Sequence, residues 1–222
     1  MSFAMPVNDQ SAYAAANMVP EGRIVLFDPL AAFEGITGAV NLGLFPEDAV
    51  VAPSSEVTRE VIRAVNPEGG PSIVVDERVT ETTITYEIPV LTPSEQVRSL
   101  HNGAPAVALT DPTLAGVSVT PFSPGASILG RMVVIAKRPG TDANRLFRVF
   151  WHPRVALQSN GQGESQGEQT LLFTATVRAH TYEPGPAFDD VATQITQYGA
   201  IFTVPASQLP DLLAALDAEA AA

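Results

Sequence analysis

Residues 79–90 read VTETTITYEIPV, and their alternation is the clearest structural signal in the chain. The even positions carry most of the apolar side chains and are Thr82, Ile84, Tyr86, Ile88 and Val90. The odd positions are polar and include Glu81, Thr83, Thr85 and Glu87. A period of two residues places successive side chains on opposite faces of a strand. We therefore expect a strand with one face toward a core and one polar face.

Upstream, residues 37–61 read TGAVNLGLFPEDAVVAPSSEVTREV and continue this pattern after an interruption. They predict a turn, a short apolar strand around Asn41 and Leu42, a break at Gly43 and Pro46, and a polar strand from Ser54. In the polar strand Glu56, Thr58 and Glu60 share one face, and Val57, Arg59 and Val61 share the other. This extended stretch carries no residue pattern typical of catalysis.

The remaining patterns predict a mainly β domain over residues 21–205. Further strands are expected at 22–28 (GRIVLFD), 130–136, 145–155 and 169–180, and a flexible polar loop at 159–169. Residues 1–20 are small, polar and without a period, which predicts an extended N-terminal arm or disordered tail.

Two helices are expected. The first spans about 92–102, with Thr92 as N-cap, Glu95 completing a capping box, Gly103 after the end, and Val97 and Leu100 facing inward. The second lies within 206–222, with Ser207 as its cap. Its apolar stripe is Leu209, Leu212, Leu213 and Leu216.

Composition excludes several classes of function. The chain has 222 residues with 45% hydrophobic side chains, enough for a core, and no cysteine for disulfides or thiolate metal sites. Its formal charge of −12 disfavours gripping nucleic acid or an anionic membrane. No apolar run reaches the roughly 18 residues of a membrane helix, and the N-terminus lacks the pattern of a signal peptide. We expect no membrane insertion and a cytoplasm-like compartment before assembly.

Residues that could carry chemistry are sparse. His101, His152 and His180 lack metal-binding spacing, and no nucleophile elbow or phosphate-binding loop is present. The pair Asp189 and Asp190 is better explained as a solvated loop. We predict no catalytic, cofactor-binding or metal-binding residues, and no enzyme activity.

The order of these segments resembles the tail tube (major tail) proteins of long-tailed, non-contractile (siphovirus-like) bacteriophages. The resemblance covers about the first half of the chain. It runs from GRIVLFD at 22–28 through TGAVNLGLFPED at 37–48, SSEVTREV at 54–61 and VTETTITYEI at 79–88 to LTPSE at 91–95.

This resemblance implies a β-sandwich or barrel-like subunit with a flanking helix, an inter-ring loop and an extended N-terminal arm. Subunits of the family form rings, usually hexameric, whose strands join around a channel, and the rings stack into a tube that carries DNA to the host. The implied location is the virion tail, assembled in the host cytoplasm. Implied partners are further copies of the chain and the tape measure, terminator and distal tail proteins, with no cofactor.

Residues 37–80 would then form the inter-ring loop and the lumen-lining strands. The lumen candidates are Glu56, Glu60, Glu81 and Glu87, because carboxylates repel DNA phosphates and let the duplex slide. The inter-ring contact candidates are Leu42, Leu44, Phe45 and Pro46. Deletion of residues 1–18 is expected to leave a folded monomer that makes no long tubes.

Other readings stay open at this point. The chain could be the inner tube subunit of a contractile tail or injection device, a tail-terminator ring, or a stand-alone β-sandwich that binds carbohydrate or another ligand. The similarity of GRIVLF at 22–27 to GRMVVI at 130–135 leaves internal duplication possible, and with it three copies per ring instead of six.

Overall fold

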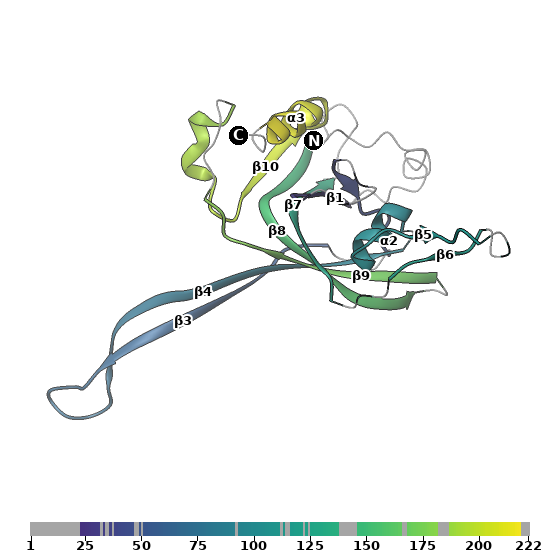
Figure 1. Ribbon diagram of the computed structural model, residues 1–222. Coiled ribbons are helices and arrows are strands. Elements are labelled where there is room, and N and C mark those ends of the chain that lie inside the picture. Colours follow the sequence, from purple (N-terminus) through teal and green to yellow (C-terminus); the bar gives the residue numbers. More distant parts are fainter. Residues whose placement is uncertain are drawn as a thin grey trace.

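The structure is a computed structural model. It describes residues 23–31, 33, 36, 38–46, 49, 51–91, 93–111, 113, 116–121, 123, 125–137, 146–165, 168–181 and 187–218. The expected N-terminal arm at 1–20 lies outside this part of the chain. Within it, the predicted mainly β fold is confirmed (Figure 1).

One antiparallel sheet dominates the molecule, with strand order β2-β1-β7-β8-β9-β4-β3 and with β10 also paired to β8. A separate two-stranded hairpin, β5–β6, lies beside helix α2. The strands are β1 Arg23–Pro29, β2 Val40–Asn41, β3 Ser54–Ala64, β4 Ile73–Val90, β5 Val107–Ala108, β6 Ser118–Val119, β7 Ser127–Lys137, β8 Leu146–Ser165, β9 Glu168–Val177 and β10 Ala200–Pro205. The helices are α2 Glu95–Asn102 and α3 Leu209–Ala218, and 3-10 turns span Asp189–Gln194 and Ala206–Gln208.

Strand β8 folds the sheet on itself (Figure 1). It pairs with β7 along one edge, while its other edge pairs first with β10 over Leu146–Trp151 and then with β9 over Val155–Ser165. Of the two segments that resemble each other, residues 23–27 lie in β1 and residues 130–135 in β7, and these strands are neighbours in this one sheet.

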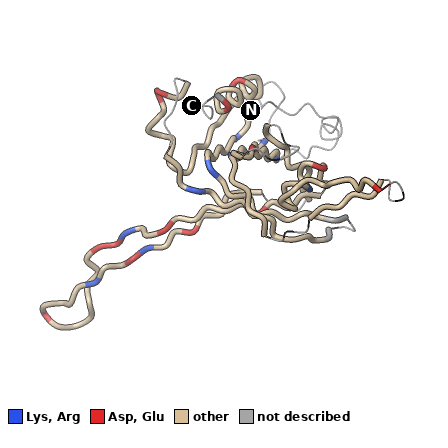
Figure 2. The backbone as a smooth tube through the Cα atoms, viewed as in Figure 1, with Lys and Arg blue, Asp and Glu red and all other residues tan. Residues whose placement is uncertain are grey.

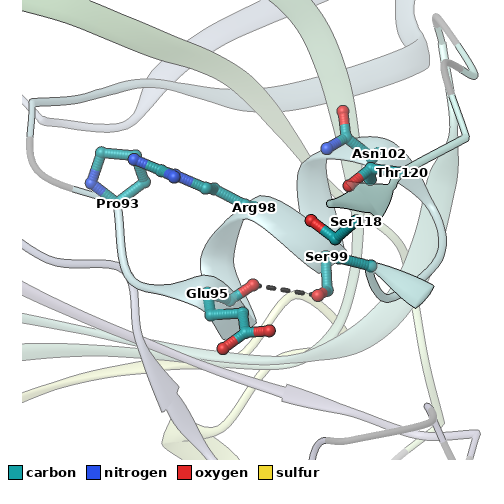
Figure 3. Close-up of a pocket in the computed structure, with 8 residues that line it drawn as sticks. Pro93, Glu95, Arg98, Ser99, Asn102, Ser118 and Thr120 are labelled. Atoms are coloured by element: carbon teal, nitrogen blue, oxygen red, sulfur yellow. Dashed lines mark hydrogen bonds between the residues drawn. The ribbon is translucent and has the colours of Figure 1, made fainter. Parts of the chain in front are cut away.

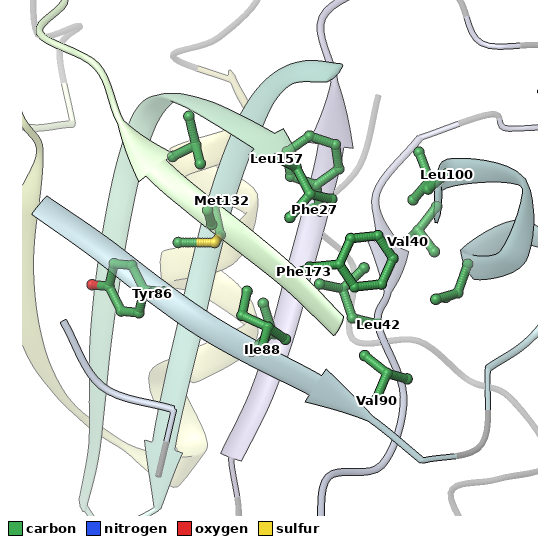
Figure 4. Close-up of a cluster of buried hydrophobic side chains, with 14 of the residues drawn as sticks. Phe27, Val40, Leu42, Tyr86, Ile88, Val90, Leu100, Met132, Leu157 and Phe173 are labelled. Atoms are coloured by element: carbon green, nitrogen blue, oxygen red, sulfur yellow. The ribbon is translucent and has the colours of Figure 1, made fainter. Parts of the chain in front are cut away.

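Two hydrophobic cores lie on opposite faces of the folded sheet. The first (Figure 4) is built mainly from β1, β4, β7, β8, β9 and α2, and includes Phe27, Leu42, Tyr86, Ile88, Val90, Leu100, Met132, Leu157 and Phe173. The second lies under α3 and includes Leu26, Val133, Ile135, Val149, Trp151, Val204, Leu209, Leu213 and Leu216. Both faces of β1 are therefore buried, which explains the nearly continuous apolar run in GRIVLFD.

A buried ion pair links the sheet to α3. Arg131 on β7 lies directly opposite Asp28 on β1, and Arg131 Nε is 3.0 Å from Asp28 Oδ2. Arg131 Nη2 is also 3.6 Å from Asp217 Oδ1 in α3.

The first helix is correctly predicted in place, but the predicted N-cap is wrong. Ser94 is the N-cap, and its hydroxyl accepts a 3.3 Å hydrogen bond from the Val97 N–H. The helix therefore begins two residues later than a Thr92 cap requires, because Ser94 reaches the third helical N–H and Pro93 stays outside. Val97 and Leu100 are buried as expected, and Gly103 ends the helix with a φ of 75°.

At the C-terminus, Ser207 lies inside the 3-10 turn Ala206–Gln208 and does not cap a helix. Helix α3 starts at Leu209, because the 3-10 turn leads directly into it. Leu209, Leu213 and Leu216 are buried as the stripe predicts, and Leu212 is partly buried.

The described residues of the glycine-rich segment 159–169, which are 159–165 and 168–169, form strands rather than the flexible loop that the composition predicts. Strand β8 continues to Ser165 and pairs with β9, whose first residue is Glu168. A register shift between Ser159 and Gln162 accommodates Gly161, whose φ of 106° suits glycine.

Candidate functional site

Strands β3 and β4 leave the body as a long two-stranded hairpin, here called the arm and defined as residues 54–83 (Figure 1). Residues 54–63 of β3 and 73–81 of β4 are exposed on both faces. β3 is the last strand of the sheet, and β4 pairs with β9 only from Ile84 onward. The arm therefore has two exposed faces and two backbone edges that no described strand of this chain covers.

The register of the arm defines its faces. Directly opposite residues share a face, and the pairs include Glu56 with Thr83, Thr58 with Glu81 and Glu60 with Arg78. Irregularities between Thr58 and Arg59 and between Ile62 and Arg63 leave Thr80 and Val75 as extra residues on β4.

One face of the arm, here called the acidic face, gathers most of its carboxylates. It carries Glu56, Glu60, Asp76, Glu81 and, at the base, Glu87, with Arg78 as its cation. The four glutamates predicted to face a lumen thus lie on the same face, and all four are exposed. Glu60 Oε2 accepts a 2.7 Å hydrogen bond from Arg78 Nη2. Charged residues follow one another along the arm in Figure 2.

The opposite face, here called the valine face, continues the core-facing side of β4. Tyr86 and Ile88 on that side are buried in the body. Beyond Ile84 the same side carries Val57, Val61, Val74 and Val79, which are 42–57% exposed. It also carries Arg59, Arg63 and Glu77, of which Arg59 and Glu77 form a 3.1 Å ion pair.

The predicted inter-ring residues lie in the body rather than on the arm. Leu42 is fully buried in the first core and donates its N–H to the Val25 carbonyl, so the prediction that it contacts another ring is wrong. Leu42 directly follows β2, which pairs with β1, and this pairing brings Leu42 to the core. Phe45 packs partly against the same core, and Leu44 and Pro46 are partly buried, so their role stays a prediction.

Sequence reasoning missed a second projecting element. The hairpin β5–β6 pairs Val107 with Val119, and the Leu109 N–H donates to the Val117 carbonyl at 2.9 Å. The signal was the alternation in VAL at 107–109 and VSV at 117–119, but two-residue strands are too short to stand out.

A groove of about 360 Å³ separates this hairpin from α2 (Figure 3). Its lining includes Glu95, Arg98, Ser99 and Asn102 from the helix and Ser118 and Thr120 from the hairpin side. The Ser99 hydroxyl donates to the Glu95 carbonyl, so it is engaged within the helix. Among the described residues that line the groove there is one carboxylate and one guanidinium, and no nucleophile–base pair.

Two of the three histidines hold the core together. His152 bridges Tyr86 and the carbonyl of Tyr198, and His101 Nε2 lies 2.9 Å from the Gly161 carbonyl and 3.0 Å from Ser159 Oγ. Both side chains are buried, and their ring nitrogens are engaged in these contacts. Across the described ranges, no three His, Cys, Asp or Glu side chains cluster as metal ligands would.

Asp189 and Asp190 are exposed at the start of a 3-10 turn, as expected for a solvated segment. Neither α2 nor α3, nor any other helix in the described part of the chain, has the length and apolar character needed to cross a membrane.

Comparison with known proteins identifies no family and no relative for this chain. No protein-family model matches the chain, and no curated protein matches its sequence.

Proposed function

We propose that this protein is the structural subunit of a hollow tube, in which rings of identical copies stack around a channel that DNA crosses. The observation that carries the proposal is the arm, with its exposed faces and its uncovered backbone edges. A two-stranded hairpin standing alone in water is marginally stable. Exposed strand edges also invite pairing with other chains. In this proposal, neighbouring copies of the chain cover the exposed faces of the arm and pair with its backbone edges.

Ring formation would give both backbone edges of the arm a pairing partner. If the arms of successive copies pair side by side, each edge meets the arm of a neighbour, and closing the ring leaves no edge exposed. Such contacts are heterologous, so rotation closes the ring while stacking along the axis remains open-ended. A stand-alone ligand-binding sandwich, in contrast, gives the arm no role.

In this proposal the acidic face lines the channel and makes its surface negatively charged. Arms in a closed barrel place one face inside, and the acidic face is the one suited to DNA, because carboxylates offer phosphates no counterion-releasing contact. Glu56, Glu60, Glu81 and Glu87 would line the lumen. The resemblance to tail tube proteins implies a location in a virion tail, a hexameric ring and partners at each end of the tube, and these are part of the proposal.

Electron microscopy of the concentrated full chain tests the proposal. We expect tubes or stacked rings. A variant in which residues 57–82 are replaced by Asn-Gly leaves the pair Glu56 and Thr83 joined by a tight hairpin turn. It should stay monomeric with an unchanged thermal midpoint, because no residue of the arm is among the described members of either core. A full chain that remains monomeric at every concentration, or an armless variant that still forms tubes, would refute the proposal.

A further inference from the structure

The β5–β6 hairpin presents its apolar side to solvent. Val107 lies opposite Val119 and Leu109 opposite Val117, so a period of two places all four side chains on one face. They are 37–65% exposed. The other face carries Ala106, Ser118 and Thr120 and lines the groove beside α2.

The polar side of the hairpin faces the groove beside α2, where Ser118 and Thr120 remain exposed. The apolar side points the other way, and its four side chains also remain exposed in the single copy. Contiguous exposed apolar side chains of this kind mark contact surfaces.

The valine face of the arm has the matching chemistry. It is also a two-stranded surface rich in β-branched residues: Val57 and Val61 lie on either side of Arg59 on β3, and Val79 lies opposite Arg59 on β4. Two such ribbons can stack face to face about 10 Å apart and exclude water from their apolar side chains.

Charge also matches. Asp111 is the single charged residue between positions 104 and 130. Hydrogen bonds from Thr113 lower the pKa of Asp111 and keep it ionised. The valine face carries Arg59, Arg63 and Glu77, and Arg59 is paired with Glu77. The face therefore keeps a net positive charge, with Arg63 nearer the end of β3.

The two surfaces project from opposite sides of one molecule (Figure 1). They cannot meet within one copy, but the arm of one copy can reach the hairpin of the next. At about 3.3 Å per residue, an 11-residue strand such as β3 extends roughly 36 Å.

We propose that the valine face of the arm packs on the apolar face of the β5–β6 hairpin of a neighbouring copy, with Arg63 near Asp111. This contact rests on the proposed tube and names the surface on the receiving copy. Each patch is far smaller than a standard stable interface of about 1,600 Å², so one contact is weak and the assembly depends on its repetition.

The natural chain has no cysteine, which permits a clean cross-linking test. Val61→Cys and Val119→Cys proteins are mixed under assembly conditions and treated with a short bis-maleimide. We expect a cross-linked heterodimer at a yield at least about tenfold above that of a Glu60→Cys and Val119→Cys mixture, because neighbouring residues on a strand point to opposite faces. Cross-links within each single-variant sample give the background.

A charge exchange tests the same contact without cysteine. Asp111→Arg alone should raise the protein concentration needed for assembly about fivefold, the effect of a surface charge pair, and adding Arg63→Asp in the same chain should restore it. If tubes form but the Val61–Val119 yield equals the Glu60 control, the contact proposed here is wrong and the tube proposal stands. If the full chain forms no assembly at all, both proposals fail.

Discussion

The hydroxyl of Tyr86 lies 2.6 Å from Nε2 of His152, and the two rings meet edge to face at a centroid distance of 5.3 Å. His152 Nδ1 lies 2.7 Å from the carbonyl oxygen of Tyr198, which can only accept, so Nδ1 carries the proton. Nε2 then accepts from the tyrosine hydroxyl. The pair joins β4 to β8 and holds His152 neutral.

Stability should therefore fall in mild acid. Burial lowers the pKa of His152 from its ordinary value of 6.5. The unfolded chain binds the proton first as pH falls, so stability is full above about 6.5 and is lost between that value and the lower folded pKa. The loss is about 1.4 kcal/mol for each unit of pKa depression.

Urea unfolding at about pH 7.5 and about pH 5 measures this loss. A His152→Gln variant has no ring to titrate and should show a smaller difference between the two pH values. Equal differences in the natural chain and the variant would show that His152 does not control the effect.

Gly130 should not tolerate a side chain. A Cβ there would lie 2.4 Å from Phe27 Cζ and 2.6 Å from the Asp28 carbonyl oxygen, and the backbone cannot move aside cheaply. We expect Gly130→Ala to lower the free energy of unfolding by about 1–3 kcal/mol. Gly163→Ala is the matched control in the same sheet, because its nearest neighbour would be Leu172 Cδ1 at 3.7 Å. Equal stability of the two variants in urea would contradict this packing.

Helix α3 offers a similar comparison between adjacent leucines. Leu213 is completely buried in the second core, whereas Leu212 is only partly buried. Leu213→Ala should cost about 2–5 kcal/mol through lost burial and the cavity left behind. Leu212→Ala should cost less than half as much in the same unfolding experiment. A reversed order would mean that α3 docks through another face.

Much of the fold could be predicted because its signals are local. The alternation in 79–90 correctly assigns Tyr86, Ile88 and Val90 to the core. The leucine spacing near the C-terminus likewise identifies the buried side of α3, with Leu212 at its margin. Even the grouping of Glu56 with Glu60 on one face follows from period two.

The remaining features depend on contacts between distant segments. Leu42 is buried because β2 pairs with β1, which no local pattern reveals. The glycine-rich segment after Ser159 is a strand because β9 pairs with it and bulging at Gly161 absorbs the extra residues. Thr92 and Ser94 are both capable caps, and local sequence does not choose between them.

The acidic face provides the last prediction, which rests on the proposed tube. Glu56→Lys with Glu81→Lys should make assembled tubes retain double-stranded DNA, because each ring would then present lysines to the phosphates. Retention should weaken steeply with salt, since it arises from counterion release.

Labelled DNA that co-sediments with tubes at low and high salt measures this retention. Thr82→Lys is the control, because Thr82 lies opposite Val57 on the valine face and adds charge away from the acidic side. If both variants assemble and retain DNA equally, the acidic face does not line the channel. If only the acidic-face variant retains DNA, the acidic face of the arm points into the lumen. The valine face then points outward, because a period of two places it on the opposite side of the arm.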